Sequence, residues 1–206
     1  MDTELLKVFD HHGKHTGIAT REEVHSKGLW HETFHCWFIS KEEDKHFLHF
    51  QMRCAEKKDY SNLLDITAAG YINAEENVAD GIREVHEELG IDLALEDLIY
   101  IGCIQDEIIQ DIIIDRELAH IFFYNIPNPL NYTFQMEEVV GIMKVELALF
   151  EQLWFGKIEN ICATGIVVDK KLRQVEVDRR VAKGDFLPHT NAYISNVLME
   201  LKKIIE

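Results

Sequence analysis

The segment at residues 75–89 limits the possible folds most strongly, because its pattern predicts a helix with two different faces. Each residue of an α-helix advances by about 100° around the axis. The apolar residues of the segment therefore share one face: Val78, Ile82, Val85 and Leu89. Gly90 follows directly and is the residue type that most often ends a helix. We expect the apolar face to form part of a hydrophobic core.

The opposite face of the same helix is predicted to be acidic. Four carboxylates fall within about 100° of one another: Asp80, Glu84, Glu87 and Glu88. Like charges four residues apart destabilise a helix by roughly a few tenths of a kcal/mol per pair, and Gly81 costs about another 1 kcal/mol. A helix that breaks several local rules is more often functional than accidental. This face is either solvated surface or a site for a hard cation such as Mg²⁺ or Mn²⁺.

Net charge limits the partners that this chain of 206 residues can bind. It has 21 Lys and Arg residues against 37 Asp and Glu residues, which gives a formal charge of −16. Residues 75–97 hold nine acids and one Arg, and residues 105–117 hold five acids and one Arg. Such a chain is poorly suited to nucleic acid polymers, which require basic surface, and to anionic membranes. We therefore expect neither partner.

Hydrophobic patterning outside this helix predicts a sheet with few helices. Strands or short apolar segments are expected at 5–9, 33–40, 47–53, 64–72, 98–104, 118–126 and 139–147. Further helices are expected at 148–155 and 190–205. Strands interleaved with few helices are typical of a mixed α/β or α+β fold. We expect a domain at 1–160 and a C-terminal extension at 161–206, which ends in a helix and packs on the same domain.

Cysteine usage and the C-terminal helix bear on location and assembly. The four cysteines are far apart and form no C-x-x-C motif: Cys36, Cys54, Cys103 and Cys162. Thiols with this spacing are typical of a reducing, cytoplasmic environment. The apolar C-terminal helix and the expected strand edges are compatible with a homodimer.

The stretch from Arg83 to Ile91, with the sequence REVHEELGI, resembles the second half of the Nudix box. That half reads R-E, an aliphatic residue, any residue, E-E, any residue, G and an aliphatic residue, and every fixed position is matched. The first half requires a glycine fourteen residues before the arginine and a glutamate eight residues before it. Gly70 lies thirteen residues before Arg83, so the box loop is one residue shorter here. Glu75 or Glu76 fills the glutamate position, and the spacing favours Glu75.

Upstream segments resemble the isopentenyl-diphosphate-isomerase-like branch of the Nudix proteins. Residues 29–37 are similar to the entry strand of that branch, and residues 52–58 are similar to its R-x-x-x-K-K stretch. The resemblance covers residues 5–155, about three quarters of the chain. It implies the Nudix fold, in which a mixed β-sheet is sandwiched between helices, here with a C-terminal helical extension.

Two departures from the isomerase argue against isomerase activity. The isomerase carries a catalytic Cys before the box glycine and a metal-binding His after it, where this sequence has Ala69 and Tyr71. An alanine methyl group cannot donate the proton that an allylic isomerisation needs. His25 and His31 resemble other metal ligands of the isomerase, but the set lacks its third His. The resemblance therefore implies a hydrolase. A non-catalytic module that binds a phosphoryl ligand, and less favoured an isopentenyl diphosphate isomerase, are the alternatives.

The implied activity is hydrolysis of the diphosphate linkage in a nucleoside diphosphate derivative or a similar X-linked diphosphate. Mg²⁺ or Mn²⁺ is the implied cofactor, because a divalent ion screens the phosphate charge and activates a bound water. The partner is thus a small-molecule diphosphate, and metal binding lets an acidic protein bind it.

The resemblance also implies a role for each residue of the site. The implied metal ligands are the box glutamates, the carbonyl of the box glycine and one acid from a neighbouring strand: Glu84, Glu87, Glu88, Gly70 and Glu117. Glu84 or Glu87 is implied as the general base, and Arg83 as the residue that orients a box carboxylate. Arg53 and Lys57 resemble diphosphate contacts of the isomerase branch.

Overall fold

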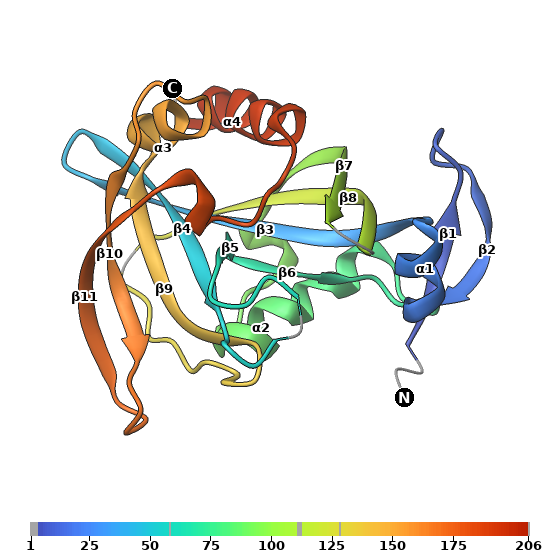
Figure 1. The fold of residues 1–206 in the computed structure, drawn as a ribbon, viewed down its shortest axis with the longest axis horizontal. Helices are drawn as coiled ribbons and strands as arrows, with labels where there is room; N and C mark the ends of the chain where they lie inside the picture. Colours follow the sequence, from blue (N-terminus) through green and yellow to red (C-terminus); the bar gives the residue numbers. More distant parts are fainter. Residues whose placement is uncertain (1–3, 58, 111–112, 128, 206) are drawn as a thin grey trace.

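A computed structural model gives the fold and describes residues 4–57, 59–110, 113–127 and 129–205 (Figure 1). Lys58, part of the R-x-x-x-K-K stretch, lies outside these ranges. The strands are β1 (Leu5–Phe9), β2 (His15–Thr20), β3 (Trp30–Glu42), β4 (Lys45–Arg53), β5 (Leu64–Ile66), β6 (Ala68–Tyr71), β7 (Ile99–Gln110), β8 (Ile113–Asn125), β9 (Val139–Glu146), β10 (Ile161–Val168) and β11 (Gln174–Val181). The α-helices are α1 (Arg21–Lys27), α2 (Arg83–Leu89), α3 (Leu147–Trp154) and α4 (Asn191–Ile205), and the 3₁₀ helices are η1 (Val78–Ile82), η2 (Leu95–Asp97) and η3 (Lys183–Asp185). The predicted mixed α+β class is confirmed.

One mixed sheet carries the fold within the described residues. Its strands follow the order β11-β10-β9-β4-β3-β1-β2, and the hairpin of β7 and β8 joins through β8, which lies beside β3. β3 and β8 run parallel, whereas β3 and β4, β4 and β9, and β7 and β8 are antiparallel. Among the described residues, no helix is both long and apolar enough to span a membrane.

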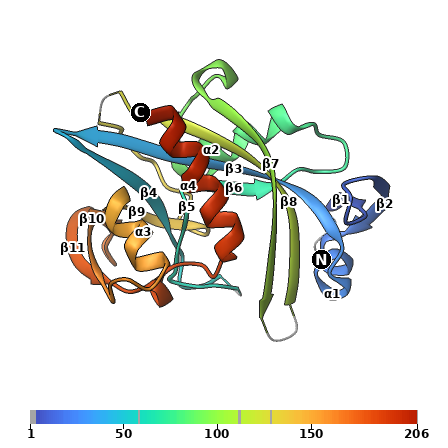
Figure 2. The same ribbon diagram turned by 90° about the horizontal axis from the view of Figure 1, so that it is seen from above.

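Helices cover both faces of this sheet (Figure 1 and Figure 2). Alternate side chains of a strand point to opposite faces, and along β3 this alternation separates two hydrophobic clusters. Trp37 packs in the cluster that includes residues of α3 and α4. Phe34 and Phe38 pack in the other cluster, together with Val85 and Leu89 of α2. The predicted core face of the box helix is therefore confirmed.

β3 and β4 separate partway along their length, and this fork makes room for a site. The two strands pair over residues 38–42 and 45–49 and then diverge. The chain at 64–71 fills the gap, because β5 pairs with β4 and β6 pairs with β3. Gly70 and its neighbours are thereby held at the fork.

The helix predicted at 75–89 forms only in part. A 3₁₀ helix, η1, comes first, and the α-helix proper begins at Arg83. Asn77 caps η1, and its backbone N–H donates to Oδ2 of Asp80 at 2.9 Å. Because this bond ties Asp80 to the cap, Asp80 does not join the acidic face where the helical wheel places it.

The C-terminal part contains a β-hairpin that we did not predict from the sequence. β10 pairs with β9 and β11 pairs with β10, so the hairpin extends the main sheet. In β11 valines alternate with charged residues, which is the pattern of a half-exposed strand. The helix predicted at 190–205 is present as α4, and its side chains Tyr193, Val197 and Leu201 are buried in the core.

Candidate active site

Gly70 allows a carboxylate of the box helix to lie directly against β6. It pairs with Phe34 of β3, on the face that α2 covers. A Cβ atom at position 70 would overlap the carboxylate of Glu84 and force that side chain to move. Glycine leaves the space in which the carboxylate of Glu84 and the backbone at Gly70 come together.

Arg83 binds several groups of the box at once. Its Nε and Nη2 atoms donate to the two carboxylate oxygens of Glu76, at 2.7 and 3.2 Å. Nη2 also donates to the carbonyl of Tyr71 at 3.0 Å. Nη1 donates to Glu84 and, at 3.1 Å, to Glu87. The bidentate pair with Glu76 fixes the guanidinium, which in turn orients the other two carboxylates.

The acid that pairs with Arg83 is Glu76, not Glu75, which the spacing favoured. Gly70 and Glu76 are six residues apart, as the box pattern requires, so the missing residue lies between Glu76 and Arg83. That interval contains η1. A 3₁₀ helix rises about 2.0 Å per residue, against about 1.5 Å for an α-helix. The more extended 3₁₀ form spans the interval with fewer residues and keeps the ion pair.

Glu88 is buried, although the helical wheel places it opposite the core face. It is 6% exposed, and its Oε2 accepts hydrogen bonds from Nε2 of Gln51 at 3.2 Å and from the backbone N–H of Ala69 at 3.1 Å. Burial and the neighbouring Glu84 raise the pKa of Glu88 to about 8. Burial likewise raises the pKa of Glu84 to about 7. Burial therefore disfavours the charged form of both carboxyl groups.

The box residues offer oxygen donors of the type that a hard divalent cation takes, although in the described residues the three box glutamates do not bring their carboxylate oxygens within 4.8 Å of one another. Buried carboxylates whose charge is disfavoured gain most from a positive charge beside them. The available donors are carboxylate oxygens of Glu84, Glu87 and Glu88 together with the backbone carbonyl of Gly70. Oxygen donors of this kind are the ligands that Mg²⁺ and Mn²⁺ prefer.

Arg53 and Lys57, which the resemblance implies as diphosphate contacts, lie near Glu88 of the box helix. Nη1 of Arg53 donates to Oδ2 of Asp65 at 2.9 Å, and Lys57 forms an ion pair with Glu138. Burial and the charge of Arg53 lower the pKa of Lys57, while the charge of Glu88 acts in the opposite direction. Each cation already has a carboxylate partner, so an anion such as phosphate would compete with Asp65 for Arg53 and with Glu138 for Lys57.

Known proteins resemble this chain in sequence and in fold. An uncharacterized Nudix hydrolase from Clostridium acetobutylicum is 40% identical over 202 residues, which cover 98% of each chain. The chain belongs to the Nudix hydrolase family. The crystal structure of DR0079 from Deinococcus radiodurans shares the fold, with a TM-score of 0.53 and 14% identity over 72% of this chain and 89% of that one. No model of a known protein family matches the chain.

A second group of possible metal ligands occurs in this Nudix hydrolase. One ligand atom from each of His25, His31 and Asp115 lies within 4.8 Å of the others. His31 is fully buried, and its Nε2 lies 3.5 Å from Oδ1 of Asp115. In the described part of the chain neither of these two atoms has a hydrogen-bond partner. Burial lowers the pKa of His31 to about 4, so the ring is in the neutral form that binds metals. Since buried polar atoms are nearly always paired, a cation is a suitable partner for both atoms.

Glu117 lies with this second group and not with the box glutamates. It is opposite His31 in the parallel pairing of β3 and β8, and its Oε2 is 3.3 Å from Nε2 of His35. Ala119 and Ile121, which share its face of β8, pack in the cluster of α3 and α4. The box helix covers the opposite face. This arrangement separates Glu117 from the box glutamates, with which the resemblance grouped it.

A buried charge network joins the start of α4 to Arg53. Nδ1 of His189 lies 2.7 Å from Oδ2 of Asp106, and its Nε2 lies 3.4 Å from Oδ1 of Asp65. Although burial opposes it, hydrogen bonding to the two aspartates raises the pKa of His189 to about 10. Asp65 also binds Arg53. Sequence reasoning missed this network because its members are far apart along the chain and belong to no motif.

Replacing His31 by Gln is expected to remove one bound divalent ion and leave the box site able to bind metal. The amide cannot supply the ring nitrogen that faces Asp115. Isothermal titration with Mn²⁺ measures the stoichiometry of the wild type and the variant. His46→Gln is the control, because His46 lies on β4 outside the cluster. Equal stoichiometry in the His31→Gln variant and the wild type would contradict a metal role for this group.

Proposed function

We propose that this protein is a metal-dependent hydrolase that cleaves the diphosphate linkage of a nucleoside diphosphate derivative or a similar X-linked diphosphate. The observation that carries the proposal is the pair of buried box carboxyls, Glu84 and Glu88, whose pKa values are raised by burial. A divalent ion beside them would stabilise their charged forms. The charges of both Arg53 and Glu88 act on the pKa of Lys57. The basic residues that would bind the diphosphate and the acidic residues that would bind the metal therefore lie close to one another.

Each residue has a part in the proposed reaction. Bound Mg²⁺ or Mn²⁺ supplies screening of the phosphate charge and a water of lowered pKa. The proposed ligands are Glu84, Glu87, Glu88 and the carbonyl of Gly70. Arg83 keeps Glu84 and Glu87 oriented through its hydrogen bonds, and one of these two carboxylates accepts the proton of the attacking water. Arg53 and Lys57 bind and orient the diphosphate oxygens.

The residues at the isomerase positions support hydrolysis over isomerisation. Ala69 packs against the core and contacts Glu88 through its backbone N–H, and its methyl group carries no proton to donate. The hydroxyl of Tyr71 lies 3.1 Å from Nε2 of His25. We therefore propose that the chain resembles the isomerase-like branch in its scaffold but lacks the isomerase's catalytic Cys.

The short box loop is the feature that favours a non-catalytic binding module, because a shorter loop could misplace the first half of the box. The contacts of this loop argue for the hydrolase instead. Glu76 reaches Arg83 through two hydrogen bonds, and Gly70 remains against Glu84. The geometry needed for the box is thus retained despite the missing residue.

The acidic surface and the thiols support two further parts of the proposal. We propose that the protein acts in the cytoplasm on a small molecule and binds neither nucleic acid polymers nor membranes. The cysteines are free in the described residues, and Cys36 and Cys54 are buried, as is common for reduced proteins. A homodimer stays a prediction.

A diphosphate library, assayed for release of phosphate, pyrophosphate or a phosphomonoester, tests the proposal. With Mg²⁺ or Mn²⁺ we expect at least one compound to be hydrolysed, and with EDTA we expect the activity to fall to background because the box glutamates then have no cation to hold. A matched library of isopentenyl diphosphate and its allylic isomer tests the isomerase alternative. Binding of a diphosphate without hydrolysis under any metal condition would contradict the proposal and favour the binding module.

A further inference from the structure

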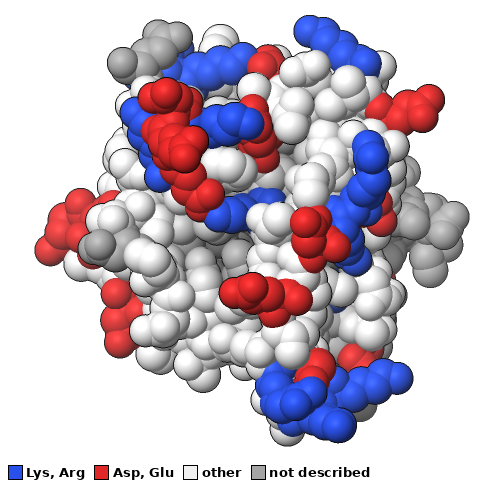
Figure 3. Space-filling view, turned by 90° about the vertical axis from the view of Figure 1, so that its left-hand side faces the viewer, with Lys and Arg blue, Asp and Glu red and all other residues white. Residues whose placement is uncertain are grey.

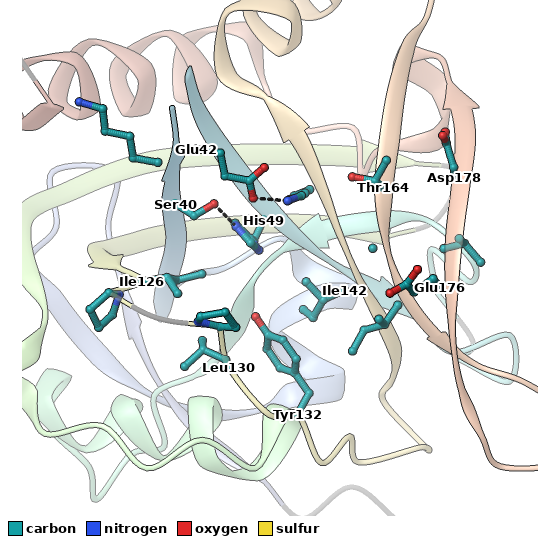
Figure 4. Close-up of a pocket in the computed structure, with 17 residues that line it drawn as sticks. Ser40, Glu42, His49, Ile126, Leu130, Tyr132, Ile142, Thr164, Glu176 and Asp178 are labelled. Atoms are coloured by element: carbon teal, nitrogen blue, oxygen red, sulfur yellow. Dashed lines mark hydrogen bonds and ion pairs between the residues drawn. The ribbon is translucent and has the colours of Figure 1, made fainter. Parts of the chain in front are cut away.

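A cavity of about 840 Å³ lies on the same side of the sheet as α2 but away from the box. It is lined by the end of β3, by His49 of β4, by the chain after β8, and by strands β9, β10 and β11 (Figure 4). Pockets that bind small molecules have roughly this volume, about 300–1,000 Å³. The apolar lining includes Ile126, Leu130, Ile142 and Ile166. The cavity is therefore large enough and apolar enough to hold a ring system, with part of the ring open to solvent.

The charges around this cavity disfavour an anion. Lys144 forms an ion pair with Glu42, which offsets its charge. Glu176 and Asp178 project from β11 at the same cavity, and Lys41 is the other lysine in the lining. Figure 3, which looks onto the side of the molecule where β10 and β11 lie, shows acidic and basic side chains interspersed over most of this face, with a group of basic side chains at its lower end. With three acids against two lysines, the rim has no surplus of positive charge that would bind phosphate.

Uncharged polar groups in the lining provide hydrogen bonds instead. Nε2 of His49 lies 2.8 Å from Oγ of Ser40. Burial lowers the pKa of His49 to about 3, so the ring is neutral and offers both a donor and an acceptor. Figure 4 shows the hydroxyl of Tyr132 directed toward the space between His49 and Ile142. The hydroxyl and imidazole groups can exchange hydrogen bonds with the polar edge of an uncharged molecule.

An aromatic wall separates the cavity from the box helix. The rings of Tyr132 and Phe134 stack with their centroids 5.5 Å apart and their planes 12° from parallel. Phe134 is buried in the cluster of α2, while Tyr132 lines the cavity. The backbone between them is tied to the end of α2, because the N–H of Thr133 donates to the carbonyl of Leu89 at 2.8 Å. The cavity is thus a separate site, with an aromatic ring on its wall for a ligand to contact.

We propose that this cavity binds a planar aromatic molecule that carries no negative charge. The apolar lining, the ring of Tyr132 and the neutral donors and acceptors select the ring system, and the acidic rim rejects anions. This proposal does not depend on the activity proposed for the box.

Two fluorescent probes of similar ring size test the proposal directly. N-phenyl-1-naphthylamine is uncharged, and 8-anilino-1-naphthalenesulfonate carries a sulfonate. In titrations of the full chain with EDTA present, we expect the uncharged probe to bind at least about tenfold more tightly. Equal affinity, or tighter binding of the sulfonate, would overturn the proposal.

Matched variants locate the binding. Thr164→Trp fills the cavity and is expected to lower the affinity for the uncharged probe at least about tenfold. Glu159→Trp is its control, since Glu159 is exposed, lies before β10 and does not line the cavity. The double variant Glu176→Lys and Asp178→Lys replaces two exposed acids, so it should raise the affinity for the sulfonate probe without disturbing the core. Unchanged binding of the uncharged probe to Thr164→Trp, or of the sulfonate to the lysine variant, would overturn the site.

Discussion

Glu88→Gln is expected to lower the turnover of the diphosphate substrate at least ~100-fold, about 2.7 kcal/mol of transition-state stabilisation. Glu88 is buried, and its carboxylate faces Gln51 and the backbone of Ala69. Glutamine has the same size but no negative oxygen for a divalent ion. The fold should survive, because burial disfavours the charge at this position in the first place. Initial rates at saturating Mg²⁺, with a substrate identified from the library, measure the loss.

Two further variants show whether the effect is specific to the metal-binding glutamates. Glu87→Gln should cause a similar loss of turnover, although the side chain of Glu87 is half exposed and contributes little to packing. Glu75→Gln is the control, because Glu75 is exposed and Arg83 pairs with Glu76 instead. Full turnover in Glu88→Gln, or an equal loss in Glu75→Gln, would contradict the assignment of the ligands.

His189→Gln is expected to lower the free energy of unfolding by about 3–5 kcal/mol. The change leaves Asp65 and Asp106 buried without the cation that lies between them. Urea denaturation of both proteins at pH 7 measures the difference. Lys203→Gln, on the helix α4 that follows His189, removes an exposed ion pair with Glu200 and should cost less than about 1 kcal/mol. Similar losses in the two variants would contradict a special role for the buried network.

The stabilisation due to His189 should also depend on pH in a defined direction. Its pKa is about 10 in the folded protein, against an ordinary value of 6.5. A raised folded pKa means that the contribution is complete below pH 6.5 and is lost as the pH rises toward 10. The groups around the ring are Asp65, Asp106, His35 and Tyr193. If the difference in free energy of unfolding between the wild type and His189→Gln stayed constant from pH 6 to pH 10, it would contradict the prediction that the His189 ring is charged in the folded protein.

Local sequence patterns predicted those features that depend on neighbouring residues. Helical periodicity identified Val85 and Leu89 as core residues, and the structure buries both. Gly90 ends the helix in the left-handed conformation, with a φ of 67°. Periodicity failed at Asp80, because the cap at Asn77 and the 3₁₀ geometry replace the α-helix there. The spacing rule failed at Glu75 for the same reason.

Long-range arrangement was beyond the reach of such patterns. The sequence shows Asp115 and Glu117 as neighbours on one strand, but the parallel pairing of β3 with β8 decides that they face the histidines. His189 and Asp65 are 124 residues apart, so no spacing rule could relate them. The cavity lined by Tyr132 likewise exists only because β10 and β11 join the sheet beside β9.

The sequence by itself determined the family, the mixed fold and the order of the box residues, because these follow from short-range spacing and from the alternation of apolar side chains. Tertiary structure decided which glutamate reaches Arg83, the burial of Glu88, and which face of the sheet each acid occupies. These depend on how the fork between β3 and β4 is filled and on which strands pair. The proposed metal affinity would follow from that placement, since a carboxylate buried beside another acid needs a cation in a way that an exposed one does not.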